Sequence, residues 1–325
     1  MRFVEGMLAL VLILSVLGCG SVPAERAGGY QVTDAQGQVV TFEEKPVRVL
    51  NFALWLDSIV LGMLPPEHLV GIDYLADDPN SSNIVGIAET IPVKLNHPSA
   101  EQVMALRPDV VFLDAGRDAA VCDTLRDMGI KVVACKKPHS AEELHDAVRL
   151  VAAALGEEEK GAALLAAFDA ECSALAERVA AIPPDARKTV LVISMSPTFG
   201  SKGGLFDHLC TMAGVTNGAA VIGLEAGQPL TKEHILAVDP DILIVPVWTA
   251  HGRYDIDKFN REYLDDPALQ TVKAIREQRI VRPHEGYIYN SSQDMVFGAQ
   301  DLAHLAYGDA IEQPVERHLS VAAGT

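Results

Sequence analysis

Aromatic and basic side chains gather just past the predicted ends of apolar strands, where they could hold a ligand. Aromatic residues make up only 6% of the chain, yet both tryptophans and four of the seven tyrosines fall in these loops. Rings bury a large area at low entropic cost, and Arg or His groups beside them orient an anionic or metal-chelating molecule. The predicted ligand contacts are Phe52, Trp55, Tyr74, His97, Arg117, Phe199, Trp248, His251, Arg253, Tyr254 and Tyr287.

Several of these residues have a plain structural alternative. Phe52 and Trp55 follow the first apolar strand and equally fit the core of that unit. His97 precedes a proline, so it either contacts the ligand or holds the turn by a hydrogen bond. His251 and Arg253 lie in a polar loop, for which solvation is the equal alternative. These alternatives stay open from the sequence alone.

Signatures of catalysis and of phosphate binding are absent from the sequence. There is no G-x-S-x-G, no Walker loop and no G-x-G-x-x-G after a strand. No C-x-x-C or Cys/His spacing indicates a structural zinc site. The 26 Lys and Arg against 44 Asp and Glu give a net charge of −18, which repels the phosphates of nucleic acids. We therefore expect a binding protein without a cofactor, and neither an enzyme nor a nucleic-acid partner.

A long-range repeat indicates which elements position the candidate contacts. The sequence SAEQVMALRPD at 99–109 returns as TKEHILAVDPD at 231–241, and an apolar strand follows each copy. Ser or Thr caps the start of each predicted helix, and Pro excludes the helical conformation for the residue before it. The strands at 110–113 and 242–245 are unbroken apolar runs, typical of parallel strands covered on both faces. This pattern predicts an α/β protein with two Rossmann-like lobes.

The two predicted lobes are joined by one long helix. Residues 141–155 form one predicted helix, and after the break at Gly156 a second helix follows with an apolar stripe at Phe168, Cys172, Leu175, Val179 and Ile182. We expect an N-terminal lobe at 30–156, a connector helix at 157–182, a C-terminal lobe at 183–312 and a tail at 313–325. Ligands of open parallel sheets lie beyond the carboxyl ends of the strands, which places the site between the lobes.

The N-terminal segment has the features of a secretory signal. An apolar run at 7–17 follows Arg2 and ends at Cys19; its eleven residues span about 17 Å, too short to cross a bilayer of about 30 Å. The segment VLGC at 16–19 resembles a bacterial lipobox, which implies that 1–18 is removed, Cys19 is lipidated and 19–29 is a tether. A plainly cleaved signal is the alternative. Either way the protein is exported, and with the lipid it is anchored at the outer face of the cytoplasmic membrane.

Export allows disulfides among the four later cysteines. Cys122, Cys135, Cys172 and Cys210 permit three full pairings. Cys122 and Cys135 are expected at the same sheet edge, so a bridge between them is one possibility. Free cysteines in the core are the other.

Several segments together give the chain a family resemblance over about residues 30–310. They are DAQG at 34–37, PVRVL at 46–50, LVGI at 69–72, SAE at 99–101, ALRPD at 105–109, GIKVV at 129–133, DPD at 239–241 and the connector helix. With these the chain resembles the periplasmic substrate-binding proteins of the iron-siderophore, haem and cobalamin ABC importers. The resemblance implies a monomer that captures a metal chelate between its lobes and delivers it to a permease driven by an ATPase. It also implies acidic lobe tips that pair with permease arginines, here Glu89 and Asp207.

The same resemblance ranks the ligands. The haem-binding branch has a Tyr where this chain has Lys94, and the cobalamin-binding branch has a Trp near Leu95. A ferric siderophore therefore comes first, a corrinoid second and haem third, held between Trp55 and Tyr74 on one side and Trp248, Arg253 and Tyr254 on the other. Two other functions remain open: a two-lobed metallochelatase, which needs a His and a carboxylate that converge, and capture of bare Zn²⁺ or Mn²⁺ by three or four ligands.

Overall fold

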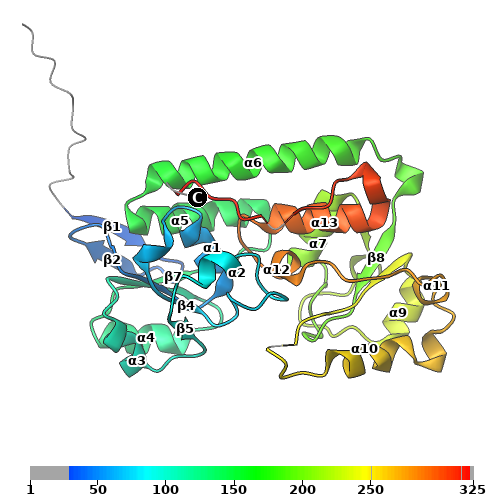
Figure 1. Cartoon of the computed structure of the whole chain (residues 1–325), viewed down its shortest axis with the longest axis horizontal. Helices are drawn as coiled ribbons and strands as arrows, with labels where there is room; N and C mark the ends of the chain where they lie inside the picture. Colours follow the sequence, from blue (N-terminus) through cyan, green and yellow to red (C-terminus); the bar gives the residue numbers. More distant parts are fainter. Residues whose placement is uncertain (1–28, 250, 316, 323–325) are drawn as a thin grey trace, which may run out of the picture.

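Two α/β lobes lie side by side beneath one long helix (Figure 1). The computed structural model describes residues 29–249, 251–315 and 317–322. The predicted signal at 1–18 and Cys19 lie outside the described residues. No helix within the described ranges is long and apolar enough to cross a membrane.

The N-terminal lobe is built on a five-stranded parallel sheet. In spatial order its strands are β5 (Lys94–Leu95), β4 (Leu69–Asp73), β3 (Val49–Asn51), β6 (Val110–Asp114) and β7 (Val132–Cys135). Its helices are α1 (Leu54–Leu61), α2 (Val85–Ala88), α3 (Ala100–Leu106), α4 (Ala119–Asp127) and α5 (Ala141–Leu155), with a 3₁₀ turn at Pro66–His68. A hairpin of β1 (Tyr30–Thr33) and β2 (Val39–Phe42) precedes them.

The C-terminal lobe repeats this plan with four parallel strands. In spatial order they are β11 (Ile280–Val281), β10 (Ile242–Ile244), β8 (Thr189–Val192) and β9 (Thr216–Asn217). The helices are α7 (Leu205–Ala213), α8 (Gly218–Val221), α9 (Lys232–Val238), α10 (Ile256–Leu264), α11 (Lys273–Arg276), α12 (Glu285–Ile288) and α13 (Met295–Tyr307), with 3₁₀ turns at Pro184–Ala186, Pro267–Leu269 and Gly308–Ala310. The predicted α/β class with parallel sheets is confirmed.

Alternation along the strands divides each lobe between two cores. In β6, Val110 and Phe112 pack into a large core with α1 and α5, whereas Val111 and Leu113 face a smaller core with α3 and α4. Successive side chains of a strand point to opposite faces, so an unbroken apolar strand must be covered on both. The large core continues into the C-terminal lobe through α7 and α13, and therefore joins the two lobes.

The repeat seen in the sequence is also a repeat of hydrogen bonds. Ser99 caps α3 in a capping box with Gln102, and Thr231 caps α9 in the same way with His234. Each helix ends at a left-handed residue, Arg107 at φ 48° and Asp239 at φ 46°.

An aspartate follows each of these helices and holds the first strand of its lobe. The carboxylate of Asp109 accepts the backbone N–H of Arg48 at 2.9 Å, and that of Asp241 accepts the backbone N–H of Thr189 at 2.8 Å. The aspartate after each proline thereby fixes where β3 and β8 begin.

The helix α6 (Glu158–Ala180) runs across the top of both lobes (Figure 1). Of its predicted stripe, Phe168, Leu175 and Val179 are buried and Cys172 is partly buried. It packs against α5 at one end and against α7 and α13 at the other. One helix therefore ties the two lobes to a shared core.

The C-terminal segment returns to the N-terminal lobe, an arrangement that the sequence pattern did not indicate (Figure 1). Ser320 Oγ donates to the carbonyl oxygen of Leu61 at 3.1 Å, and Val321 N donates to that of Gly62 at 2.8 Å. Leu319 N donates to the buried carboxylate of Asp294 at 2.8 Å, just before α13. These bonds fasten the last described residues across both lobes.

The four described cysteines are free. Cys122, Cys135 and Cys210 are buried, and burial raises the pKa of the Cys122 thiol to about 11. The default of free core cysteines therefore holds here, and the alternative bridge between Cys122 and Cys135 is not formed.

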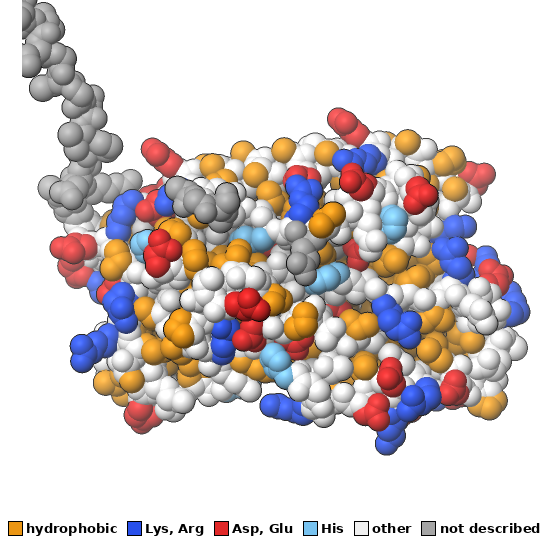
Figure 2. All heavy atoms as spheres, in the orientation of Figure 1, with side chains coloured by type: hydrophobic (Ala, Val, Ile, Leu, Met, Phe, Trp, Pro, Cys, Tyr) orange, Lys and Arg blue, Asp and Glu red, His pale blue; other side chains and the backbone are white. Residues whose placement is uncertain are grey.

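Acidic and basic side chains are interspersed over both lobes on the face shown in Figure 2.

Candidate functional site

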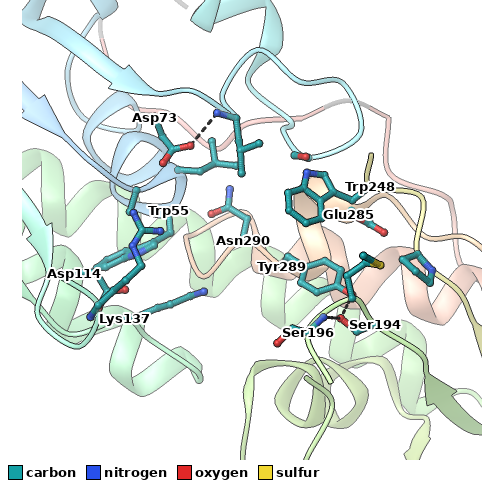
Figure 3. Close-up of a pocket in the computed structure, with 17 residues that line it drawn as sticks. Trp55, Asp73, Asp114, Lys137, Ser194, Ser196, Trp248, Glu285, Tyr289 and Asn290 are labelled. Atoms are coloured by element: carbon teal, nitrogen blue, oxygen red, sulfur yellow. Dashed lines mark hydrogen bonds between the residues drawn. The ribbon is translucent and has the colours of Figure 1, made fainter. Parts of the chain in front are cut away.

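A cavity of about 310 Å³ opens between the lobes and is lined by both (Figure 3). Four of its lining residues stand at or just past strand ends: Asp73 closes β4, Asp114 closes β6, and Ser194 and Pro246 follow β8 and β10. The carboxyl ends of parallel strands carry the loops that bind ligands in such folds. This cavity is the candidate binding site.

The N-terminal wall combines one buried ring with two cations. Trp55, at the start of α1, is only 4% exposed and belongs to the large core as well as to the cavity. Arg117 lies in the loop after β6, and its Nη2 donates to the carbonyl oxygen of Phe52 at 2.8 Å. Its Nε lies 3.3 Å from a carboxylate oxygen of Asp118. These two bonds fix the guanidinium at the edge of the cavity.

Lys137 is the second cation of this wall, two residues beyond the end of β7. Burial lowers the pKa of its ammonium group, an effect that nearby Asp114 partly offsets and Arg117 reinforces. No described residue gives Lys137 Nζ a hydrogen bond or an ion pair. The side chain extends into the cavity opposite Tyr289 (Figure 3).

The C-terminal wall is aromatic and neutral over most of its area. Tyr289 stacks on Phe199 with ring centroids 4.1 Å apart, and its hydroxyl donates to Ser194 Oγ at 2.9 Å. Trp248 lines the cavity and leans on Tyr254, with centroids 5.4 Å apart. Phe199 and Tyr254 thus support the rings that face the ligand.

Two buried carboxylates of the lining have raised pKa values. Burial raises the pKa of Asp73 to about 6 and that of Glu285 to about 7. Glu285 Oε1 accepts the backbone N–H of Val247 at 2.6 Å, and Asp73 Oδ1 accepts that of Leu75 at 2.9 Å. Both groups therefore gain protons near neutral pH while they remain bonded to their own loops.

Both indole N–H groups of the cavity lack an acceptor. Trp55 Nε1 and Trp248 Nε1 are buried, and no described residue accepts a hydrogen bond from either. Buried N–H groups normally have a partner, so each exception calls for a reason. These two stand on opposite lobes (Figure 3).

Of the predicted contacts, Trp55, Arg117 and Trp248 line the cavity. Tyr74 and His251 instead join the lobes at the rim, where His251 Nε2 lies 3.2 Å from the carbonyl oxygen of Tyr74. The backbone N–H of His251 also donates to Asp78 at 3.3 Å. We infer from these contacts that the loop at 251 closes one side of the crevice.

Of the six remaining predicted contacts, Phe199 and Tyr254 stand behind the lining rings, and the other four lie elsewhere. Phe52 is buried in the smaller N-terminal core and offers only its carbonyl oxygen to Arg117. His97 and Arg253 are exposed. Tyr287 is 1% exposed, and its hydroxyl accepts the backbone N–H of Arg317 at 2.7 Å. Tyr287 is therefore a core residue in this structure, and Tyr289 takes the place at the cavity.

Lys137, Glu285 and Asp73 line the cavity but are not among the contacts predicted from the sequence. Lys137 follows the strand at 132–135 closely, so a stricter use of the strand-end rule would have included it. In the sequence, however, the adjacent lysines Lys136 and Lys137 are typical of a solvent-exposed surface. For Asp73 and Glu285 nothing in the sequence but their place near a strand end indicates a ligand site. Charged residues next to strands are most often exposed to solvent, so that place alone did not single them out.

The two predicted docking residues differ in freedom. Glu89 is exposed at the end of α2. Asp207 is partly buried in α7, where its two carboxylate oxygens accept Gly203 N at 2.9 Å and Asn217 Nδ2 at 3.0 Å. The side chain of Asp207 is thus engaged within its own lobe.

A bare-metal site has no counterpart in the described part of the chain. Among these residues, no group of three or more His, Cys, Asp or Glu side chains is placed to hold a metal ion. Transition-metal ions bound directly need three or four such ligands.

Residues 66–285 match the family model described as periplasmic binding protein. The Fe(3+)-citrate-binding protein YfmC of Bacillus subtilis is 26% identical over 302 residues, covering 88% of this chain and 87% of that protein. The molybdate-binding protein MolA of Haemophilus influenzae is 24% identical over 260 residues, covering 72% of this chain and 69% of that protein.

Solved structures share the fold. The periplasmic haem-binding protein RhuT from Roseiflexus sp. RS-1 superposes with a TM-score of 0.67 at 24% identity, over 81% of this chain and 98% of that chain. The sequence segments, the two parallel sheets, the joining helix and the family match agree. The chain belongs to the periplasmic binding protein family.

Proposed function

We propose that this substrate-binding component of an ABC importer captures a ferric chelate of the siderophore class between its lobes. The observation that carries the proposal is one cavity lined by a tryptophan from each lobe and by two cations from one of them. Aromatic rings cover the apolar surface of a chelator, and cations match the negative charge that many ferric chelates retain. The relative named for Fe(3+)-citrate, similar over most of both chains, supports this choice.

Two positions favour a ferric chelate over haem or a corrinoid. Lys94, which stands where the haem branch has Tyr, donates from Nζ to the carbonyl oxygens of Ala88 and Ile91 at 2.8 and 2.5 Å. Leu95, near the corrinoid Trp position, is buried in the sheet. The cavity of about 310 Å³ also lies at the lower end of the usual range of ~300–1,000 Å³ for small-molecule sites, which favours a compact ferric chelate over a tetrapyrrole or a large siderophore.

A chelatase or a receptor for bare ions has less support. A chelatase needs a His and a carboxylate that converge on the substrate, whereas the described lining supplies carboxylates without a histidine. Bare Zn²⁺ or Mn²⁺ needs three or four ligands that the described residues do not bring together. Binding and release without chemistry is therefore the proposed role.

Delivery completes the proposal. We propose that Cys19 is lipidated, which would hold a monomer at the outer face of the membrane beside its permease and ATPase. The domain boundaries expected from the sequence remain part of this proposal. Glu89 is free to pair with a permease arginine. Asp207 would first have to release its bonds to Gly203 and Asn217.

The test is a titration of the exported domain, residues 20–325, with ferric siderophores, ferric citrate, haemin, cobalamin and bare Zn²⁺ or Mn²⁺. The only two tryptophans of the chain both line the cavity, so their fluorescence reports the site directly. We expect saturable quenching with submicromolar Kd for a ferric chelate. Submicromolar binding of a bare ion, or of haemin or cobalamin alone, would contradict the proposal.

A further inference from the structure

Resting on the proposed function, we infer that the ligand is an anion whose oxygen atoms bind Lys137 and Arg117, with Lys137 as the residue that selects for negative charge. Neither the family match nor the names of the relatives assign a role to Lys137. The inference concerns the chemical class of the ligand, which the fold alone leaves open.

Lys137 has no hydrogen-bond or ion-pair partner among the described residues. Its neighbour Lys136 points outward and pairs with Glu143 at 2.5 Å, whereas Lys137 lines the cavity without a hydrogen bond or ion pair from any described residue. The Lys137 side chain is partly buried in the lining, and this burial lowers the pKa of its ammonium group. Arg117, a second cation on the same wall, adds repulsion. An anion in the cavity would oppose both effects.

The acidic side chains of the lining accept hydrogen bonds from the backbone of their own loops. Asp114 Oδ1 accepts the backbone N–H of Gly116 at 2.9 Å and that of Arg117 at 3.2 Å. Asp73 and Glu285 are bonded in the same way to the backbone N–H groups of Leu75 and Val247. One oxygen of each carboxylate is thus bonded to its own loop, and none of the three carboxylates forms an ion pair with Lys137 in the described part of the chain.

Protonation of two acids, one on each wall of the cavity, supports the preference for an anion. Burial raises the pKa of Asp73 to about 6, with Asp118 raising it further and Arg117 and His97 opposing. Burial raises the pKa of Glu285 to about 7, with Asp78 adding to the shift. Both acids shed negative charge as the pH falls toward these values, so repulsion of an anionic ligand weakens.

The indole N–H groups add donors from both sides. Trp55 Nε1 and Trp248 Nε1 have no acceptor among the described residues, and an indole nitrogen only donates. A ligand rich in carboxylate oxygens offers acceptors to donors on opposite lobes at once. Given the cavity of about 310 Å³, a compact ferric hydroxycarboxylate fits better than a large macrocycle.

The experiment compares three variants with the unchanged protein. Lys137→Gln removes the charge, Lys137→Arg keeps it, and Lys136→Gln is the matched control because it removes the neighbouring charge outside the cavity. Each is titrated with ferric citrate, with the neutral ferric hydroxamate ferrichrome, with the cationic ferrioxamine B and with molybdate. Thermal unfolding checks folding, and Lys137→Gln should unfold no earlier than the unchanged protein because the lysine has no partner to lose.

We expect ferric citrate to bind the unchanged protein more tightly than the neutral and cationic chelates. Lys137→Gln should weaken ferric citrate at least tenfold, Lys137→Arg should restore most of the loss, and Lys136→Gln should stay within twofold. These ligands differ in size and shape as well as in charge. The change in affinity that Lys137→Gln causes for each ligand therefore decides the result, and not only the ranking of the ligands in the unchanged protein.

The possible failures are distinguishable. Tight binding of ferrichrome or ferrioxamine B that is unchanged by Lys137→Gln would overturn this inference and leave the proposed ferric function standing. Molybdate alone, bound in a way that depends on Lys137, would support the anion inference and contradict the ferric function. Binding of ferric citrate with equal affinity in Lys137→Gln would overturn the role of Lys137.

Discussion

The two lobes share a scaffold but present different walls to the cavity. Both begin with a strand held by the aspartate of a repeated capped helix, Asp109 in one and Asp241 in the other. The N-terminal wall carries the cations Arg117 and Lys137 beside the acids Asp73 and Asp114, whereas the C-terminal wall offers rings and hydroxyls around one buried acid, Glu285. The repeated elements of the two lobes position the cavity, and the loops that differ after the strands give its two walls different side chains.

The two tryptophans sharpen this comparison, and the largest expected effect concerns folding. Trp55 is 4% exposed within the large core, whereas Trp248 is partly exposed. Trp55→Ala should lower the free energy of unfolding by about 3–5 kcal/mol, and Trp248→Ala by less than about 1 kcal/mol. Denaturant unfolding of both variants measures this. Equal losses would mean that the two rings play the same structural part.

Trp248, whose loss should cost little stability, should contribute strongly to ligand affinity. Trp248→Ala removes a ring that faces the cavity, so we expect the binding free energy of the ferric chelate to weaken by about 1–3 kcal/mol. Calorimetric titration measures the change. Phe259→Ala, on α10 against Tyr263 and outside the lining, is the control. Unchanged affinity in Trp248→Ala would remove the ring from the site.

The buried acids of the two walls predict a pH dependence of stability. A carboxyl whose folded pKa is raised binds more protons in the folded state, so its contribution is present below its unfolded pKa and is lost as pH rises through its folded pKa. Glu285, with a pKa of about 7, should lower the free energy of unfolding by about 1.4 kcal/mol between pH 6 and 8. Asp73, with a pKa of about 6, acts lower in the same direction.

Denaturant unfolding of the apo protein at several pH values measures this trend. Buried Asp57 and His318 have raised pKa values that act in the same direction, and His208, whose pKa burial lowers, opposes them. Glu285→Gln should flatten the curve above pH 6, and Asp73→Asn the curve below it. A curve for Glu285→Gln that parallels the unchanged protein would contradict the raised pKa.

The smallest effects test whether the repeat is energetically equivalent in the two lobes. Ser99→Ala and Thr231→Ala each remove one capping bond, and each should cost about 1 kcal/mol of stability. The two sites lie in different lobes, so the double variant should lose the sum. Thermal or denaturant unfolding of the three variants decides this. Strong non-additivity would mean that the lobes unfold with a coupling that the repeat does not explain.

Local patterns in the sequence predicted the scaffold well. The helix expected at 141–155 is α5, and its Ser140 cap and Gly156 end have ordinary local chemistry. The strands at 110–113 and 242–245 were recognisable because buried parallel strands are continuous apolar runs. These features depend on neighbours in the chain, which a sequence displays directly.

The site was predicted less completely because it depends on the direction in which each side chain points. Tyr287 lies in the one-turn helix α12 and Tyr289, two residues on, caps its end in a helical conformation, so their side chains point about 200° apart, one into the core and one to the cavity. Composition does not separate them. The return of residues 319–321 to the end of α1 likewise depends on contacts far apart in the chain.

The position of the metal in the loaded protein tests the central claim most directly. Crystals of the exported domain saturated with a ferric chelate would locate the iron by anomalous diffraction at its absorption edge. The account predicts one strong iron peak between Trp55 and Trp248, with ligand oxygens toward Lys137 and Arg117. An iron peak elsewhere, such as the groove between α5 and α6 beside His145 and Asp169, would contradict it.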